Sequence, residues 1–482
     1  MRDIIRQWEK EAQALEPSTS ERKGLRKQVI DYTEGFLENI GTDRAFTKDP
    51  EKGKNIIAAQ LGTERQSIEE IVEKLASELD ASGINPASGG HLGYIPGGGI
   101  YASSLADYWA AITNRYAGVF FANPGAVRLE NKLLRWMADL VGYPEGAHGN
   151  LTSGGSVANM VSVIIAREAF GLKVRKIPDA AIYLTRQAHH SIAKAIKAAA
   201  LEECHIRYIA MDDQYRMDPL SLRIAVEKDV EAGIRPFLLV GSAGTTDVGA
   251  IDPLNDLADI SEKYGMWFHI DAAYGGFFIL CDEKKDTFKG IERSDSLVID
   301  PHKGLFIPYG LGACLVRKAD NMKKAFSFQA TYLQDIAAHQ EEINPMDVSP
   351  EMTKHFRGLR LWLPLMLYGI GPFKACLEEK LLLARYFYFK IKKTAGFEVA
   401  EHPPELSVVT FRYVPDHGDA STFNKAMLDY VHEDGRVFFS STSINGNFTL
   451  RLAILSFRTH LKTIDLAVEV IENAVFELNK KQ

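Results

Sequence analysis

The distribution of apolar and polar positions divides the chain into three regions. Residues 1 to about 85 form charged segments whose apolar positions recur at helical spacing, as in Ser67–Leu79. A helix with one narrow apolar stripe has little core of its own. We therefore expect an N-terminal helical segment, residues 1–85, that packs against the main domain or against a second subunit.

Short apolar runs alternate with helical patterns over residues 86–365. Several of these runs are apolar throughout, which is typical of parallel strands covered by helices on both faces of a sheet. The pattern predicts a large α/β domain with a mostly parallel central sheet. The candidate strands are residues 180–184, 206–210, 236–240, 266–270, 296–299 and 312–317.

The pattern changes again after residue 365, where strands and helices become mixed with longer polar stretches. We expect a small C-terminal α+β domain, residues 366–482. Its predicted elements are a helix at about 374–393, a strand at 406–413, a helix at about 421–433, strands at 435–440 and 448–454, and a helix at about 463–479.

Composition is that of an ordinary globular protein, with 46% apolar and 25% charged residues among 482. The net charge of −7 gives no reason to expect a nucleic acid or an anionic membrane as partner. No apolar run reaches membrane-spanning length, and the N-terminus lacks the apolar core of a signal peptide. The four cysteines are scattered and show no metal-ligand spacing, so we expect a cytoplasmic protein without a metal site.

Two charged residues at the ends of apolar runs are the strongest candidates for chemistry. Lys303 follows directly after Asp300-Pro301-His302, where a desolvated amine loses its proton more readily and can attack a carbonyl carbon. Asp271 follows another apolar run, where a carboxylate is costly unless it is paired. A lysine for an aldehyde and an acid for a pyridinium nitrogen are what pyridoxal phosphate requires. The alternatives are a lysine that extends to solvent and an aspartate that caps a helix.

A glycine-rich run, Gly149–Asn159, precedes a helical pattern that continues to about Phe170. Glycines let the backbone approach an anion, and a helix start offers unpaired amides to a phosphate. Gly154, Gly155 and Ser156 are therefore candidates for phosphate binding, although a plain capped helix start explains the same run. The spacing matches neither a Walker loop nor a dinucleotide fingerprint.

Two further polar runs follow predicted strands, at the edge where open α/β sheets bind ligands. His189 and His190 follow the strand at 180–184, and a histidine there either stacks on a flat ring or caps a helix. Which of the two faces a ligand stays open. Thr246 follows the strand at 236–240, in a position where threonine more often caps a turn.

Taken in order, three motifs resemble those of the group II pyridoxal-phosphate-dependent amino-acid decarboxylases. They are Gln187-Ala188-His189, His269-Ile270-Asp271-Ala272-Ala273 and Pro301-His302-Lys303. The resemblance covers roughly residues 85–365 with specific motifs and extends loosely to both ends. It implies the aspartate-aminotransferase-like fold of type I, with a mostly parallel seven-stranded sheet. It also implies an enzyme that releases carbon dioxide and an amine from an L-amino acid.

The resemblance further implies roles for individual residues. Lys303 would form a Schiff base with the cofactor, Asp271 would pair with its pyridinium nitrogen and His189 would stack on its ring. Tyr332 lies in an aperiodic stretch typical of a lid and falls where the decarboxylases carry a loop tyrosine that donates a proton. Other cofactor contacts would come from Gly154, Gly155, Ser156, Thr246, Ala273 and His302.

The resemblance gives a weaker indication of the substrate. Tyr94 and Pro96 lie in a run that corresponds to the family's substrate pocket, with Phe121 nearby in sequence, and Arg451 falls where the family places an arginine. Aromatic residues with glycines predict a roomy apolar pocket, so we expect an aromatic L-amino acid.

A transaminase or a carbon–carbon lyase on the same fold is disfavoured by the Pro-His-Lys and Gln-Ala-His motifs. An inactive relative is disfavoured by the presence of Lys303, Asp271 and His189.

Two further alternatives stay open. Glutamate, aspartate or cysteine sulfinate would need a dedicated arginine, which Arg357 or Arg360 could provide. An aromatic aldehyde synthase is the second alternative, but Tyr332 argues against it because the synthases carry phenylalanine there.

The chain departs from the family pattern at two positions. Asp300 stands where many members have asparagine, which could alter hydrogen bonding around the lysine, and His190 replaces a small residue, which could narrow the site. Neither change removes a required group. Because family members are usually homodimers with N-terminal helices wrapped across the partner, we expect a homodimer with shared active sites.

Overall fold

The computed structural model describes residues 1–62, 65–327 and 342–480. Its centre is a seven-stranded sheet in the order β3-β9-β8-β7-β6-β4-β5, in which β9 runs antiparallel to both neighbours and the other pairs are parallel. The expected mostly parallel seven-stranded sheet is confirmed. Its strands are β3 (His148–Thr152), β4 (Ala180–Leu184), β5 (His205–Tyr208), β6 (Arg235–Ser242), β7 (Trp267–Asp271), β8 (Ser296–Ile299) and β9 (Gly312–Val316).

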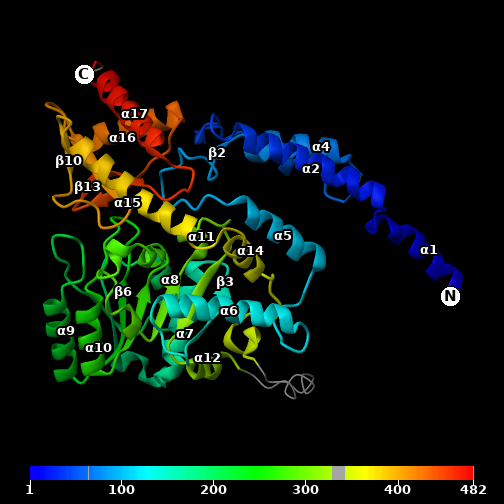
Figure 1. Ribbon diagram of the computed structural model, residues 1–482. Helices are drawn as coiled ribbons and strands as arrows, with labels where there is room; N and C mark the ends of the chain where they lie inside the picture. The colour runs from blue at the N-terminus through cyan, green and yellow to red at the C-terminus, as the bar shows by residue number, and fades with distance from the viewer. Residues whose placement is uncertain (63–64, 328–341, 481–482) are drawn as a thin grey trace.

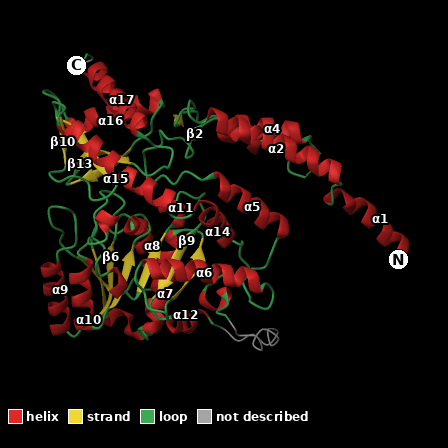
Figure 2. Cartoon of the chain, viewed as in Figure 1, coloured by secondary structure: helices red, strands yellow, loops and turns green. Residues whose placement is uncertain are grey.

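Helices cover both faces of this sheet (Figures 1 and 2). On β7, Phe268 and Ile270 pack into one hydrophobic cluster and Trp267 packs into a second on the opposite face. Every residue of β7 is therefore buried, which explains its continuous apolar run. The α-helices of this domain are α5 (Tyr101–Thr113), α6 (Pro124–Leu140), α7 (Gly155–Ala169), α8 (His190–Ala198), α9 (Pro219–Glu231), α10 (Leu254–Tyr264), α11 (Pro301–Gly304), α12 (Ala319–Phe326) and α14 (Gly358–Tyr368).

The loops that leave β4, β6, β7 and β8 meet at one edge of the sheet, because these strands are parallel. The loops after β6 and β7 approach so closely that two glycines are required. A Cβ on Gly244, where φ is +107°, would lie 2.8 Å from Cα of Gly275, and a Cβ on Gly275 would overlap the carbonyl oxygen of Ala243. This close approach brings the threonines after β6 beside the loop that follows Asp271.

The C-terminal domain is a four-stranded antiparallel sheet, in the order β10-β11-β13-β12, packed against three helices. Its core joins Leu450 and Leu452 of the sheet with Phe387 and Val431 of the helices. The elements are α15 (Gly371–Lys392), β10 (Phe397–Val399), β11 (Val408–Tyr413), α16 (Ala420–Asp434), β12 (Ser440–Ile444), β13 (Asn447–Ala453) and α17 (Leu461–Asn479).

The strand predicted at 435–440 is wrong. The apolar residues that suggested it, Val437 to Phe439, are buried. They pair with another segment instead, because Phe438 donates its N–H to the carbonyl oxygen of Gly90 and accepts a bond from the N–H of Leu92, both at 2.9 Å. The edge strand β12 begins only at Ser440 and is mostly polar. An apolar run thus predicted burial correctly but not the strand.

The N-terminal helices extend away from the rest of the molecule (Figure 1). None of the four contains a buried residue. A capping box formed by Ser67 and Glu70 fixes the start of the fourth helix. The division at residues 85 and 365 stays a prediction. The elements are α1 (Arg2–Ala12), α2 (Thr19–Asn39), α3 (Lys54–Ile57) and α4 (Ile68–Leu75), with the short pair β1 (Phe46–Thr47) and β2 (Gly83–Ile84).

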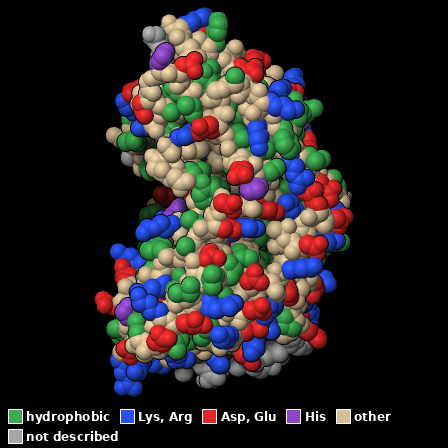
Figure 3. Space-filling model, turned by 90° about the vertical axis from the view of Figure 1, so that its left-hand side faces the viewer, with side chains coloured by type: hydrophobic (Ala, Val, Ile, Leu, Met, Phe, Trp, Pro, Cys, Tyr) green, Lys and Arg blue, Asp and Glu red, His purple; other side chains and the backbone are tan. Residues whose placement is uncertain are grey.

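Figure 3 shows acidic and basic side chains intermixed over one face of the molecule, with a recess where the C-terminal domain meets the large domain. Within the described ranges, none of the helices has the length and apolar character needed to cross a membrane. All four cysteines are unpaired.

Candidate active site

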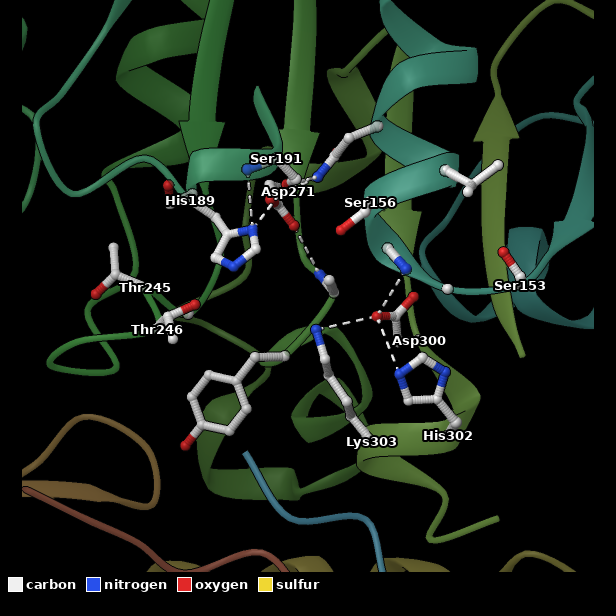
Figure 4. Close-up of a pocket in the computed structure, with 18 of the residues that line it drawn as sticks. Ser153, Ser156, His189, Ser191, Thr245, Thr246, Asp271, Asp300, His302 and Lys303 are labelled. Atoms are coloured by element: carbon white, nitrogen blue, oxygen red, sulfur yellow. Dashed lines mark hydrogen bonds and ion pairs between the residues drawn. The ribbon is translucent and has the colours of Figure 1, made fainter. Parts of the chain in front are cut away.

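A cavity of about 280 Å³ lies where the loops after β4, β6, β7 and β8 meet the first turn of α7 (Figure 4). This is the edge at which open α/β sheets bind ligands, and the volume is close to the lower limit of ordinary small-molecule sites, about 300 Å³. The structure brings all the residues predicted for the cofactor into its wall. They are Gly154, Gly155, Ser156, His189, Thr246, Asp271, Ala273, His302 and Lys303.

Lys303 lies in α11, directly after β8, and its side chain is 23% exposed. Its Nζ lies 3.0 Å from Oδ2 of Asp300, so the amine has a carboxylate partner that was not predicted from the sequence. Asp300 is fully buried, and the same oxygen accepts a hydrogen bond from the N–H of Gly155 at 3.1 Å. The acid that stands in place of the family's asparagine therefore links the lysine to the glycine-rich turn.

Asp271 ends β7 on the other side of the cavity (Figure 4). Its Oδ1 accepts the N–H of Ala273 at 3.1 Å, and its Oδ2 accepts Nδ2 of Asn159 at 2.9 Å. Among the described residues it forms no ion pair within 4.0 Å. Because a carboxylate has about four lone-pair sites, it retains room for a ligand that donates a proton.

His189, and not the exposed His190, lines the cavity. The two ring centroids are 4.0 Å apart. Nδ1 of His189 accepts the N–H of Ser191 at 3.3 Å and lies 2.7 Å from its Oγ, which places the ring proton on Nε2. Burial lowers the pKa of His189, so the ring is neutral at pH 7. The histidine therefore caps α8 and also presents its ring to the cavity, so both predicted roles are compatible.

The glycine-rich turn forms the start of α7 at the cavity wall (Figure 4). A Cβ on Gly155 would lie 2.7 Å from Oδ2 of Asp300 and 3.1 Å from Cβ of Ala273, so a larger residue does not fit there. The first-turn amides of a helix lack intrahelical acceptors and favour an anion. One of them, that of Gly155, already donates to Asp300.

The remaining wall combines hydroxyl, methyl and imidazole groups. Oγ1 of Thr245 accepts the N–H of Ala250 at 3.0 Å and so acts as the turn cap, whereas the adjacent Thr246 also lines the cavity. Ala273 lies between Asp271 and the glycine-rich turn. His302 is buried, which lowers its pKa, and its Nε2 lies 3.6 Å from Oδ2 of Asp300.

The residues predicted for the substrate lie outside the wall of this cavity. Tyr94 and Phe121 are 60% and 58% exposed, and Pro96 is buried. Tyr94 has a positive φ of 53°, a strained conformation that its neighbours must hold in place. The predicted proton donor Tyr332 lies outside the described residues.

Arg451 is buried on β13 and bonds oxygens of four residues from three separate parts of the chain. Its guanidinium donates to the carbonyl oxygen of Tyr94 at 2.8 Å, to that of Asp247 at 3.1 Å, to that of Thr246, and to Oγ of Ser440 at 3.1 Å. Burial lowers its pKa. The structure thus shows it bracing the cavity rim, a role that the sequence did not indicate.

Three polar side chains that form hydrogen bonds with the predicted site residues or with one another were not predicted from the sequence. Asn159 and Ser191 contact Asp271 and His189 directly, and His269 contacts Asn159. Two signals could have found them. Asn159 comes four residues after Gly155, on the same helix face, and His269 comes two residues before Asp271, on the same strand face.

The residues present fit pyridoxal phosphate. Three buried polar atoms at the cavity have no hydrogen-bond partner among the described residues, namely Oε1 of Gln187, Oδ1 of Asp300 and Nδ1 of His302. Because buried polar atoms are rarely left unpaired, their grouping around one cavity indicates a ligand. Lys303, together with the carboxylate of Asp271, which has no ion-pair partner among the described residues, completes the set of groups that the cofactor needs.

Comparison with known proteins agrees with this geometry. The chain matches the pyridoxal-dependent decarboxylase conserved domain over residues 50–414, which is well over half of its length. The chain belongs to this decarboxylase family. It is therefore an enzyme, a decarboxylase that depends on pyridoxal phosphate.

Relatives within the decarboxylase family cover most of the chain. The aromatic-L-amino-acid decarboxylase of Bacillus atrophaeus is 32% identical over 374 residues, 76% of this chain and 77% of that protein. A phenylacetaldehyde synthase of Petunia hybrida is 26% identical over 95% of this chain and 94% of its own. The structure of Catharanthus roseus tryptophan decarboxylase in complex with L-tryptophan superposes with a TM-score of 0.88 at 24% identity, over 96% and 99% of the two chains. This last likeness supports the type I fold.

Proposed function

We propose that this decarboxylase acts on an aromatic L-amino acid and releases carbon dioxide and the corresponding amine. The observation that carries the proposal is a single cavity with Lys303 on one wall and the carboxylate of Asp271 on the other. The names of the relatives, an aromatic-L-amino-acid decarboxylase among them, support the substrate class.

Each wall of the cavity would hold one part of the cofactor. Lys303 would react with the aldehyde, Asp271 would accept a hydrogen bond from the protonated ring nitrogen, and His189 would stack on the ring. The start of α7, with Gly154, Gly155 and Ser156, would hold the phosphate. Thr246, Ala273 and His302 would line the remaining edges.

When bound, pyridoxal phosphate supplies an aldehyde that condenses with amines and a ring that accepts the electron pair left by departing carbon dioxide. Asp271 favours this chemistry because its negative charge keeps a proton on the ring nitrogen. The carboxylate of Asp300, whose Oδ2 lies 3.0 Å from Nζ of Lys303, would be the partner of this amine when the cofactor does not hold it. The cavity walls would contribute by orienting the substrate's bond from Cα to its carboxylate so that this bond can break. Tyr332 stays our proposed donor of the final proton.

The two arginines considered for an acidic substrate favour an aromatic one instead, because neither lines the cavity. Arg357 makes two hydrogen bonds to the carboxylate of Glu351, at 3.0 and 2.9 Å. Nε of Arg360 donates to Asp107 at 2.9 Å. Both arginines that could have recognised a side-chain carboxylate are therefore already paired with acids.

Exposed apolar residues support a homodimer with shared active sites. None of the N-terminal helices contains a buried residue, and large exposed apolar patches mark interaction surfaces. Tyr94 and Phe121, the exposed residues predicted for the substrate, would then be completed by a second subunit. The same proposal places the enzyme in the cytoplasm, which its unpaired cysteines support. The exposed apolar side chains include Ile4, Trp8, Leu25, Val29, Leu105, Trp109 and Ile112.

The test is a panel of L-amino acids supplied to the purified enzyme with pyridoxal phosphate. Carbon dioxide release should be fastest with tyrosine, tryptophan or phenylalanine. Faster release from glutamate or aspartate would contradict the proposal. Hydrogen peroxide and an aldehyde in place of the amine would show instead the aldehyde-synthase alternative, and a phenylacetaldehyde synthase is among the relatives.

A further inference from the structure

One buried amide holds both of the residues proposed to face the cofactor ring. Asn159, on α7, is 1% exposed. Its Nδ2 donates to Oδ2 of Asp271 and to Oγ of Ser191, each at 2.9 Å. Oγ of Ser191 in turn lies 2.7 Å from Nδ1 of His189. Both N–H groups of the amide are therefore used, one directly on the acid and the other, through a hydroxyl, on the histidine.

The orientation of this amide is fixed by its partners. An ionised carboxylate only accepts hydrogen bonds, so nitrogen and not oxygen of Asn159 must face Asp271. The amide oxygen then points to Nε2 of His269, at 2.9 Å. For that bond to form, Nε2 must carry the ring proton of His269.

The remaining contacts of His269 agree with that tautomer. Burial lowers the pKa of His269 to about 4, so its ring is neutral at pH 7 and has a single N–H. Nδ1 must therefore accept a hydrogen bond, and the hydroxyl of Ser296 lies 2.9 Å from it. That hydroxyl in turn accepts the indole N–H of Trp267 at 2.8 Å.

The result is a hydrogen-bond chain that can run in one direction only. It starts at the indole of Trp267, which can only donate, and ends at the carboxylate of Asp271, which can only accept. The strand register builds it, because His269 pairs with Ser296 across β7 and β8, and Trp267, His269 and Asp271 share one face of β7. We call Trp267, Ser296, His269 and Asn159 the polar relay.

We propose that Asn159 is a positioning residue for the cofactor, held in one orientation by the rest of the polar relay, and that it keeps the carboxylate of Asp271 aimed at the ring nitrogen while holding the His189 ring in place. This inference rests on the proposed function, because it assumes that Asp271 meets the ring nitrogen. A donated hydrogen bond stabilises the ionised carboxylate, and in a buried site linked bonds reinforce one another.

The test compares two ligands on the cofactor-free protein. One is pyridoxal phosphate, and the other is its analogue with CH in place of the ring nitrogen, which cannot bond to Asp271. Asn159→Leu keeps the branching at Cγ, with a somewhat larger side chain, but removes all three hydrogen bonds. We expect its dissociation constant for pyridoxal phosphate to rise about tenfold to hundredfold, with a much smaller change for the analogue.

Ser162→Ala is the matched control. Ser162 is a buried hydroxyl on the same helix, but it bonds the carbonyl oxygen of Ala158 and lies 3.1 Å from Sγ of Cys314, outside the polar relay. This variant should bind both ligands as the unchanged protein does. Melting temperatures without ligand show whether each variant is folded.

Ser296→Ala provides a second variant should Asn159→Leu fail to fold. It leaves Asn159 in place but removes the group that fixes the tautomer of His269, so we expect a rise of a few-fold, again for pyridoxal phosphate only. Equal weakening of both ligands in the folded variant, or no weakening of either, would overturn the role of Asn159.

Failure of the proposed function itself has a different signature. It would appear as unchanged protein that does not bind pyridoxal phosphate, or as an Asp271→Asn variant that weakens both ligands equally. If the preference for pyridoxal phosphate over the analogue is lost in Asp271→Asn but kept in Asn159→Leu, the role of Asn159 is refuted and the proposed function stands.

Discussion

The two walls of the cavity are built differently. On the Asp271 wall, each buried polar side-chain atom of Asn159 and of the residues bonded to it has a hydrogen-bond partner. On the Lys303 wall, Oδ1 of Asp300 and Nδ1 of His302 have none among the described residues. A group of side chains with all its hydrogen bonds made, as around Asn159, is suited to holding a ring in one place. A wall with spare acceptors is suited to a lysine that changes partners during turnover.

The largest effect on activity should come from a substitution on the Lys303 wall. Lys303→Ala removes the only amine proposed to react with the cofactor aldehyde, so we expect activity to fall by on the order of a thousandfold or more. Borohydride reduction followed by mass spectrometry of the peptide that contains residue 303 measures covalent attachment directly. Attachment elsewhere, or full activity in the variant, would contradict the assignment.

On the Asp271 wall, the substitution Asp271→Asn keeps the shape of the side chain but removes its charge. The ring nitrogen then loses the partner that keeps it protonated, so we expect kcat to fall by on the order of a hundredfold. The visible absorbance of the bound cofactor should shift in the same variant. Unchanged kcat and an unchanged spectrum would show that Asp271 is only a turn residue, bonded to the N–H of Ala273.

His269, which supports the Asp271 wall through Asn159, should also affect how the stability of the protein depends on pH. Histidine in the unfolded chain has a pKa near 6.5, whereas burial lowers the pKa of His269 to about 4. The unfolded state binds the proton first, so stability is full above pH 6.5 and declines as the pH falls from there towards 4. His269→Gln keeps an N–H donor but does not titrate in this range, so the loss of unfolding free energy between pH 7 and pH 5 should shrink by about 2 kcal/mol.

Denaturant titrations at the two pH values measure this difference. Burial also lowers the pKa values of His91 and His148 to about 4, but these residues are present in both proteins and their contributions cancel. Ser162→Ala should keep the full pH dependence. The same dependence in His269→Gln as in the unchanged protein would refute the expectation.

The smallest effect, on cofactor binding, should come from Asp300 on the Lys303 wall. Asp300→Asn removes a buried negative charge beside the Gly155 N–H, which the cofactor phosphate is proposed to share. We expect pyridoxal phosphate to bind about threefold to tenfold more tightly, because like charges no longer lie side by side. Titration of the cofactor-free protein measures this constant. Weaker binding would instead show that the carboxylate mainly orients Lys303.

Much of the fold follows from apolar runs, and the failures have a common cause. The strands at Ala180–Leu184 and Ser296–Ile299 were predicted with their observed bounds because both are fully buried. β3 was missed because His148-Gly149-Asn150 reads as a loop, and β12 because its serines and threonine lie at an edge of the sheet. Strands whose formation depends on a neighbour's register carry little signal of their own.

The same distinction applies to the site. Lys303 and Asp271 could be predicted because each is chemically conspicuous at the end of an apolar strand. Asn159 and Ser296 are ordinary polar residues, and their importance comes from the pairing of β7 with β8 and from the face that α7 presents. The residues predicted for the substrate lie away from the cavity wall, and exposure at Tyr94 and Phe121 is compatible with completion by another subunit.

Arg451 has a consequence for how the molecule can move. Its positive charge sits away from solvent, and its hydrogen-bond acceptors among the described residues are neutral oxygens, contributed by the loop after β6, by Tyr94 and by β12. Swinging the C-terminal domain outwards would strip the guanidinium of these acceptors without offering it a carboxylate, a costly exchange for a buried cation. The C-terminal domain and the rim of the cavity should therefore move as one rigid body. Any hinge must lie outside the segments that Arg451 contacts.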